Sequence, residues 1–120
     1  MIGADSYPKL LKYKNEWEKL SSTVKARGDE MKQDETLAIK LFLKQLANEY
    51  NDIERLSKGI LDPQKSDRGI AIGKQFRKLI RECDDAVSKG DLNKIIENYP
   101  VSNKLLTEFI ELLQDVPDEL

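Results

Sequence analysis

Apolar residues recur every three or four positions along most of this chain, which is the spacing of one face of an α-helix. Short segments with glycine, proline or a capping aspartate divide the pattern into four stretches. These predict helices over residues 7–27, 34–58, 67–89 and 91–114, followed by a loose C-terminal tail. The predicted seams are Leu10, Tyr13, Trp17, Leu20 and Val24; Ile39, Phe42, Leu46, Ile53 and Leu56; Ile72, Phe76, Leu79, Cys83 and Ala86; and Leu92, Ile95, Tyr99, Leu106, Phe109 and Leu113.

Residues with special backbone or capping chemistry predict the helix ends. Ser6 is a good N-cap for the first helix, and Asp34 is the favoured cap of the second. Gly28 suits the position after a helix because glycine takes a positive φ without a clash. Asp91 caps the fourth helix. Pro100 interrupts that helix, but the apolar stripe keeps its phase, so we expect one kinked helix.

Two regions depart from a simple amphipathic pattern. Asp62 and Pro63 indicate a short turn before the third helix, and Gly69 and Gly73 lower its helix propensity near the start. The two glycines indicate either a close approach of another helix or a ragged helix start. The early second helix is apolar on nearly every side, which predicts cover on more than one side. Its extra apolar residues are Leu37, Ala38, Leu41 and Leu43.

Helices of about 20 residues joined by short loops must run antiparallel to their neighbours in sequence. The chain has 120 residues, enough to bury one core. We therefore predict a single all-α domain, residues 1–120, folded as an up-down antiparallel four-helix bundle. No run of apolar residues approaches the ~18–20 that a membrane span needs, so any membrane association would be peripheral.

The residue inventory removes most catalytic and metal chemistry. The chain has no histidine and one cysteine, which leaves no Ser-His-Asp or Cys-His system, no Glu-x-x-His di-iron motif and no ordinary zinc site. Carboxylate pairs such as Glu108 and Glu111 are interpreted as solvated helix surface. We expect no enzyme activity, no cofactor and no metal. Cys83 and Trp17 are predicted core residues.

Net charge is only −2, but basic residues gather in one region, where 63–81 holds six lysines and arginines against one aspartate. Four of them are spaced i, i+3, i+4 and i+7, on one helix face opposite the apolar seam. This is either an ordinary solvated face or a docking stripe for an acidic protein surface or anionic lipid; the slightly acidic total does not favour nucleic acid. The candidate docking residues are Lys74, Arg77, Lys78 and Arg81, preceded by Lys65 and Arg68.

One stretch of the sequence indicates more about the protein than composition alone does. Ile80 to Val87 resembles the third-helix pattern of the PsbQ-like family of extrinsic photosystem II proteins. The loop Lys89-Gly90-Asp91 and the following helix, with Lys94, Tyr99 and Val101-Ser102-Asn103, are similar to that family's last helix. The segment Leu41 to Ile53, with Leu46 and Tyr50, is similar to its second helix, and Leu61 to Lys65 to its connecting loop. The resemblance covers about residues 37–113.

The resemblance implies a non-catalytic four-helix subunit that docks on the lumenal face of photosystem II. It implies photosystem II core and other extrinsic subunits as partners, stabilisation of the oxygen-evolving complex, and help in retaining calcium and chloride. The long proline-rich N-terminal arm of the plant proteins is missing, which makes the chain more similar to the extrinsic subunit of diatoms and related algae. We expect a monomer when free, in the chloroplast thylakoid lumen after removal of a targeting peptide. The alternative is a cytosolic interaction bundle: an adaptor, immunity or signalling module.

Overall fold

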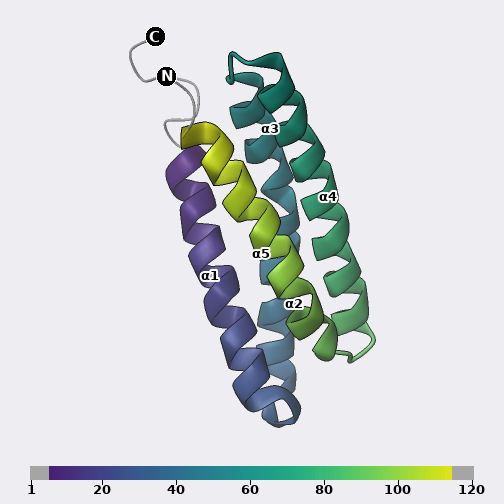
Figure 1. Cartoon of the computed structure of the whole chain (residues 1–120). Coiled ribbons are helices and arrows are strands. Elements are labelled where there is room, and N and C mark those ends of the chain that lie inside the picture. The colour runs from purple at the N-terminus through teal and green to yellow at the C-terminus, as the bar shows by residue number, and fades with distance from the viewer. Residues whose placement is uncertain (1–5, 115–120) are drawn as a thin grey trace.

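The computed structural model describes residues 6–114, and every regular element within them is helical. The elements are α1 (Ser6–Arg27), a short 3-10 helix η1 (Gly28–Glu30), α2 (Gln33–Asn48), α3 (Tyr50–Lys58), α4 (Pro63–Ser88) and α5 (Asn93–Gln114). Because α3 continues α2 along nearly the same axis, four long helical segments pack together (Figure 1). The predicted all-α class is confirmed. The predicted loose tail lies outside the described residues.

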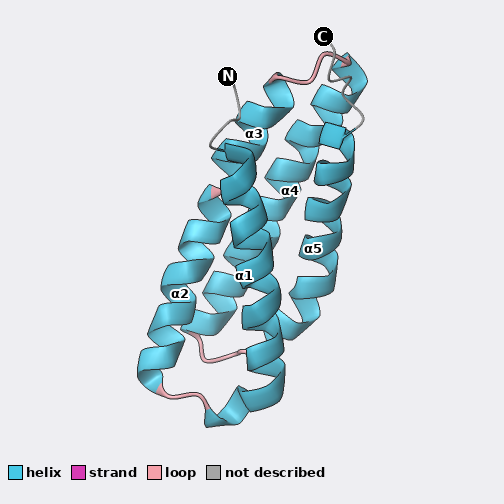
Figure 2. Ribbon diagram, turned by 90° about the vertical axis from the view of Figure 1, so that its left-hand side faces the viewer, coloured by secondary structure: helices cyan, strands magenta, loops and turns pink. Residues whose placement is uncertain are grey.

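The packing partners do not simply follow the order of the chain. α4 packs against α2, α3 and α5, whereas α1 packs mainly against α5 and also against α3 (Figures 1 and 2). The first and last helices are therefore neighbours in space. The side chains at the start of α1 face the rod formed by α2 and α3.

The predicted seams form the core. Trp17, Phe76 and Phe109 are fully buried, as are Leu46, Ile95 and Leu106. Phe42 and Leu79 are only partly buried and pack against the edge of this core. The aromatic rings meet between α1, α2 and α5. The ring centroids of Tyr13 and Phe42 lie 5.9 Å apart, and those of Trp17 and Tyr99 lie 5.7 Å apart.

The prediction that the start of the second helix is covered on more than one side is wrong. Leu43 is buried, but Leu37 and Leu41 are 55% and 63% exposed. They lie on the outer side of α2, away from the α4 contact. Scattered leucines on a surface are common, because folded proteins lack enough polar side chains to cover themselves.

Several predicted helix ends differ from the structure, and α5 begins at Asn93 rather than at residue 91. Asp34 lies inside the first turn of α2, whose N-cap position is Lys32; the Lys32 amide donates to Glu35 Oε1 at 3.5 Å. Gly28 does not take a positive φ, because the chain turns into η1 at that residue. Ser6 is the first residue of α1, and its hydroxyl donates across the fold to Asp52.

The third predicted helix begins earlier than expected. α4 starts at Pro63 rather than at Asp67, because Asp62 caps it directly: Asp62 Oδ1 accepts from the Gln64 amide at 2.9 Å. The predicted end at residue 89 is one residue beyond Ser88, the last residue of α4. Gly90 has φ 87°, and the amides of Gly90 and Asp91 donate to carbonyls of the last helical turn, which is the Schellman arrangement.

The two glycines in α4 mark a close helix approach, and the ragged start is not observed. A Cβ on Gly69 would overlap Ser57 Oγ and meet Phe109 Cε1 at 3.1 Å. A Cβ on Gly73 would meet Ile53 Cγ2 at 3.0 Å. These residues therefore let the backbone of α4 lie against the side chains of α3. α5 continues through Pro100 as one helix, as its unbroken apolar stripe predicted.

Candidate functional site

Three of the predicted docking residues point outward from α4. Lys74, Lys78 and Arg81 are exposed, and within residues 6–114 the structure records no hydrogen bond or ion pair for any of them. Arg77 is half-buried at their edge, where its guanidinium carbon lies 4.1 Å from the centroid of the Tyr50 ring. We call Lys74, Arg77, Lys78 and Arg81 the basic face. It spans two turns of helix.

The two remaining candidates lie elsewhere. Arg68 forms a paired hydrogen bond with the Glu108 carboxylate on α5, with Nη2 2.8 Å from Oε1. Positions 68 and 77 are about two and a half turns apart in an α-helix, so Arg68 and Arg77 lie on opposite flanks of α4. Lys65 is half-buried near the start of the helix. The structure therefore does not bring the six predicted residues into one surface.

Acidic residues limit the basic face at both ends. Glu54 of α3 lies on the side of Lys74. Hydrogen bonds from Tyr50 and then from Lys58 lower the pKa of the Glu54 carboxyl, and the charge of Lys74 lowers it further by a smaller amount. Glu82 and Asp85 are exposed directly after Arg81. The positive charge is thus confined to the middle of α4.

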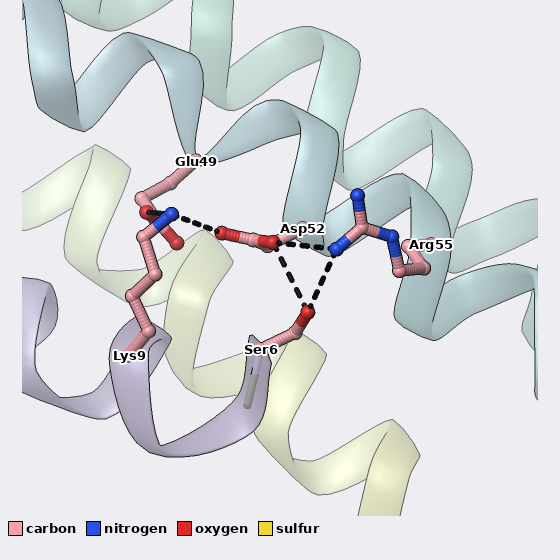
Figure 3. Close-up of polar contacts among 5 residues, drawn as sticks. All are labelled: Ser6, Lys9, Glu49, Asp52 and Arg55. Atoms are coloured by element: carbon pink, nitrogen blue, oxygen red, sulfur yellow. Dashed lines mark hydrogen bonds and ion pairs between the residues drawn. The ribbon is translucent and has the colours of Figure 1, made fainter. Parts of the chain in front are cut away.

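A second group of polar and charged residues lies between α1 and α3, and sequence reasoning missed it. It consists of Ser6, Lys9, Glu49, Asp52 and Arg55, which we call the buried charge cluster (Figure 3). Its two carboxyl groups are buried, whereas the side chains of Lys9 and Arg55 are 53% and 62% exposed. Glu49 is 1% exposed and Asp52 is 6% exposed. Lys9 Nζ lies 3.1 Å from Asp52 Oδ2 and 3.4 Å from Glu49 Oε1. Ser6 Oγ donates to Asp52 Oδ1 at 3.1 Å.

The cluster sits where α2 gives way to α3. At Glu49 the backbone hydrogen bond spans three residues and not the four of an α-helix, because the Glu49 amide donates to the Leu46 carbonyl. The Ile53 amide donates to the Glu49 carbonyl, so helix resumes at once. No proline or glycine marks this interruption, which is why the pattern predicted one helix across it.

The two carboxyl groups of the cluster have opposite electrostatic tendencies. Burial raises the pKa of Glu49 to about 7, and the neighbouring Asp52 carboxylate adds to this rise, while Lys9 opposes it. Burial also acts to raise the pKa of Asp52, but hydrogen bonds from Glu49, Lys9 and Ser6 outweigh it and hold that pKa below its usual value. A proton shared by the pair therefore belongs to Glu49 near neutral pH.

A signal for this cluster was present in the sequence. Glu49 occupies a seam position, three residues after Leu46 and four before Ile53, where the apolar pattern of the helix calls for a core residue. An acidic residue in a seam must find a partner or a proton when it is buried. Its partner Lys9 comes from another helix, so spacing along one helix could not identify it.

The structure offers little else for chemistry. Among the residues it describes, no group of three or more Asp, Glu, Cys or His side chains is placed to hold a metal ion. Cys83 is buried, as predicted, and burial raises the pKa of its thiol to about 12. None of the helices within residues 6–114 is both long and apolar enough to cross a membrane.

Comparison with known proteins adds no relative. No protein-family model, no curated protein and no solved structure matches this chain.

Proposed function

We propose that this chain is an up-down antiparallel four-helix bundle that acts by docking on a partner through the basic face, without catalysis. The observation that carries the proposal is the outward position of Lys74, Lys78 and Arg81, three neighbouring cations that form no hydrogen bond or ion pair within the described residues. Short loops and the packing of each long segment against its neighbours support the bundle topology.

An acidic protein surface fits the basic face better than a lipid surface. Helices that lie in a membrane interface place large apolar side chains beside their basic ones. The exposed large apolar residues of the described chain are Leu37, Leu41, Leu61 and Val101, and none of them belongs to α4. The apolar side of α4 is used in the core. Binding by charge alone, at a rigid helix surface, is typical of a protein partner whose charges are complementary.

The small contribution of each exposed charge to the binding free energy decides how the proposal must be tested. One exposed ion pair contributes only ~0–1 kcal/mol, so a single substitution would change binding little. Several like charges on one face act together on the rate of association, and salt screens them over ~8–10 Å. The basic face should therefore contribute a strongly salt-dependent part of the affinity.

For the particular partner, we propose photosystem II. In this proposal the chain is a PsbQ-like extrinsic subunit that docks on the lumenal face of the photosystem, in the chloroplast thylakoid lumen. It stabilises the oxygen-evolving complex and helps to retain calcium and chloride. The pattern similarity over residues 37–113, together with a helical fold that offers a charged surface, supports this proposal.

The test is the triple variant Lys74→Glu, Lys78→Glu, Arg81→Glu. Arg77 stays unchanged, because its guanidinium packs on the Tyr50 ring and its loss would disturb α3. Rebinding to salt-washed photosystem II particles and recovery of oxygen evolution are measured over a range of salt concentrations. We expect weaker rebinding and a shallower salt dependence, with an unchanged helical circular-dichroism spectrum.

The matched control is Lys12→Glu, Lys19→Glu, Lys25→Glu, which makes the same charge change at exposed positions of α1. It should rebind like the unmodified chain. If the control loses binding and the α4 variant keeps it, the docking surface belongs to α1. If the unmodified chain binds no photosystem particles, the photosystem proposal fails and the alternative of a cytosolic adaptor, immunity or signalling module takes its place. Binding to vesicles of anionic lipid instead would overturn the choice of a protein partner.

A further inference from the structure

The two buried carboxyl groups of the charge cluster have unequal surroundings. Both oxygens of Asp52 have polar partners: Oδ2 faces Lys9, and Oδ1 accepts from Ser6 and lies 3.4 Å from Arg55 Nη1. Glu49 Oε1 has only the longer contact with Lys9, and no donor reaches the buried Glu49 Oε2, so a hydrogen bond between Glu49 and Asp52 requires a proton on Glu49. Two ionised carboxylates cannot share a buried site without strong repulsion. The proton that relieves this repulsion therefore has its place on Glu49.

Each element packed around Glu49 contributes a definite set of charges. α1 supplies Lys9, and α3 supplies Asp52 and, through it, Arg55. α4 contributes Gly73, which has no side chain, and the guanidinium of Arg77, which lies over the ring of Tyr50. The charged residues of the nearby half of α5 are turned elsewhere. Glu108 is bound by Arg68, and Lys104 and Glu111 are exposed.

We propose that the buried charge cluster is a pH-dependent contact between α1 and α3: it holds the first turn of α1 in place while Glu49 carries a proton, and weakens when Glu49 ionises. Protonated Glu49 is within hydrogen-bonding reach of Asp52 and leaves Lys9 free to neutralise Asp52. Ionised Glu49 faces Asp52 with a like charge. Lys9 must then serve both buried carboxylates, because Arg55 pairs with Asp52 and not with Glu49. The element that responds is the start of α1, because Ser6 and Lys9 are its only links to the cluster.

The direction of the pH effect follows from the pKa shifts of Glu49 and Asp52. The pKa of Glu49 is raised to about 7 in the folded chain, so its contribution is fully present below the ordinary value of 4.5 and is lost as the pH rises through 7. The pKa of Asp52 is lowered, so its contribution is present above its ordinary value of 3.8 and is lost as the pH falls through the folded value. The contact is therefore strongest in mildly acidic solution, above the pH at which Asp52 takes up a proton and below the pH at which Glu49 loses one.

Amide hydrogen exchange on the full chain tests the proposal between pH 6 and pH 9. Protection factors, corrected for the intrinsic pH dependence of exchange, are measured for residues 10–13, whose amides donate to the carbonyls of the first turn of α1, and for α3. Above pH 7 each further unit should lower protection of the first turn of α1 by up to about tenfold, the limit for one proton. In Glu49→Gln, where the amide imitates the protonated carboxyl, protection should be independent of pH over this range.

The matched control is Glu97→Gln, an exposed glutamate on α5, which should keep the pH dependence of the unmodified chain. A pH dependence that persists in Glu49→Gln overturns the proposal. A second measurement remains decisive even if that variant does not fold. Carboxyl carbon NMR of the unmodified chain should show one glutamate titrating near pH 7, and in Asp52→Asn the same signal should titrate at lower pH. Titration of every glutamate below pH 5 would equally overturn it.

Discussion

The indole Nε1 of Trp17 on α1 donates a hydrogen bond of 2.9 Å to the hydroxyl of Ser102 on α5, across 85 positions of sequence. Both residues are fully buried. The same hydroxyl lies 3.1 Å from the Asn98 carbonyl one turn earlier in α5, which lets it donate to the backbone while it accepts from the indole. This buried polar contact joins one position of the first helix to one position of the last.

Ser102→Ala should destabilise the fold by about 1–3 kcal/mol, because the buried indole N–H of Trp17 loses its acceptor. Thermal or urea unfolding followed by circular dichroism measures the change. Ser22→Ala, at an exposed position of α1, is the control and should stay within about 0.5 kcal/mol of the unmodified chain. An effect of Ser102→Ala that persists at full size in a Trp17→Phe background would show that the indole is not its cause.

Gly69→Ala should also destabilise the chain, although alanine is the better helix former by ~1 kcal/mol. The new methyl group overlaps Ser57 Oγ and crowds Phe109, and overpacking of this kind costs about 1–3 kcal/mol. Gly28→Ala is the comparison, because no atom lies within 4 Å of its added Cβ and its φ is not positive. Adding Ser57→Ala to Gly69→Ala should recover part of the loss. A stabilised Gly69→Ala variant would contradict the close approach of α3 and α4.

Phe76→Ala should cost ~3–5 kcal/mol, since its ring is fully buried in α4 and its removal leaves a cavity. Leu41→Ala on the outer side of α2 should change the free energy of unfolding by less than about 0.5 kcal/mol. The midpoint and slope of a urea titration give both values. A loss below about 1 kcal/mol for Phe76→Ala would mean that α4 is rotated relative to the structure.

The thiol of Cys83 should react slowly with a disulfide reagent in native buffer and fast once denaturant is added. It is fully buried, and burial raises its pKa to about 12, so almost none of it is thiolate near neutral pH. The time course of thionitrobenzoate release at pH 8 provides the measurement. Complete labelling of the native chain within the mixing time would disprove this burial.

The apolar pattern was sufficient for the helices and for most of the core, because a period of three to four residues is a property of one helix and can be read along the chain. It placed Trp17, Phe76 and Phe109 inside correctly. It failed where the deciding partner comes from another helix. Leu37 and Leu41 look like core residues in sequence, and only the position of α4 decides that they face outward.

The candidate site was predicted in part for the same reason. Helical spacing placed Lys74, Lys78 and Arg81 on one outward face. It could not show that Arg68 forms an ion pair with Glu108 on α5. The buried charge cluster was missed altogether. Glu49 and Asp52 are acidic residues at core positions of the helix, and their partner Lys9 lies 40 and 43 positions away in sequence.

The pairing of α1 with α5 has a consequence for synthesis of the protein. A nascent chain emerges N-terminus first, so α1 leaves the ribosome long before its main packing partner exists. Until α5 follows, Leu10, Trp17 and Val24 can find only part of their final surroundings, on the α2 and α3 rod. Completion of the core must therefore await synthesis of α5. A chain cut short before Ser102 would expose the apolar face of α1 to chaperones and proteases, with Trp17 lacking its hydrogen-bond acceptor.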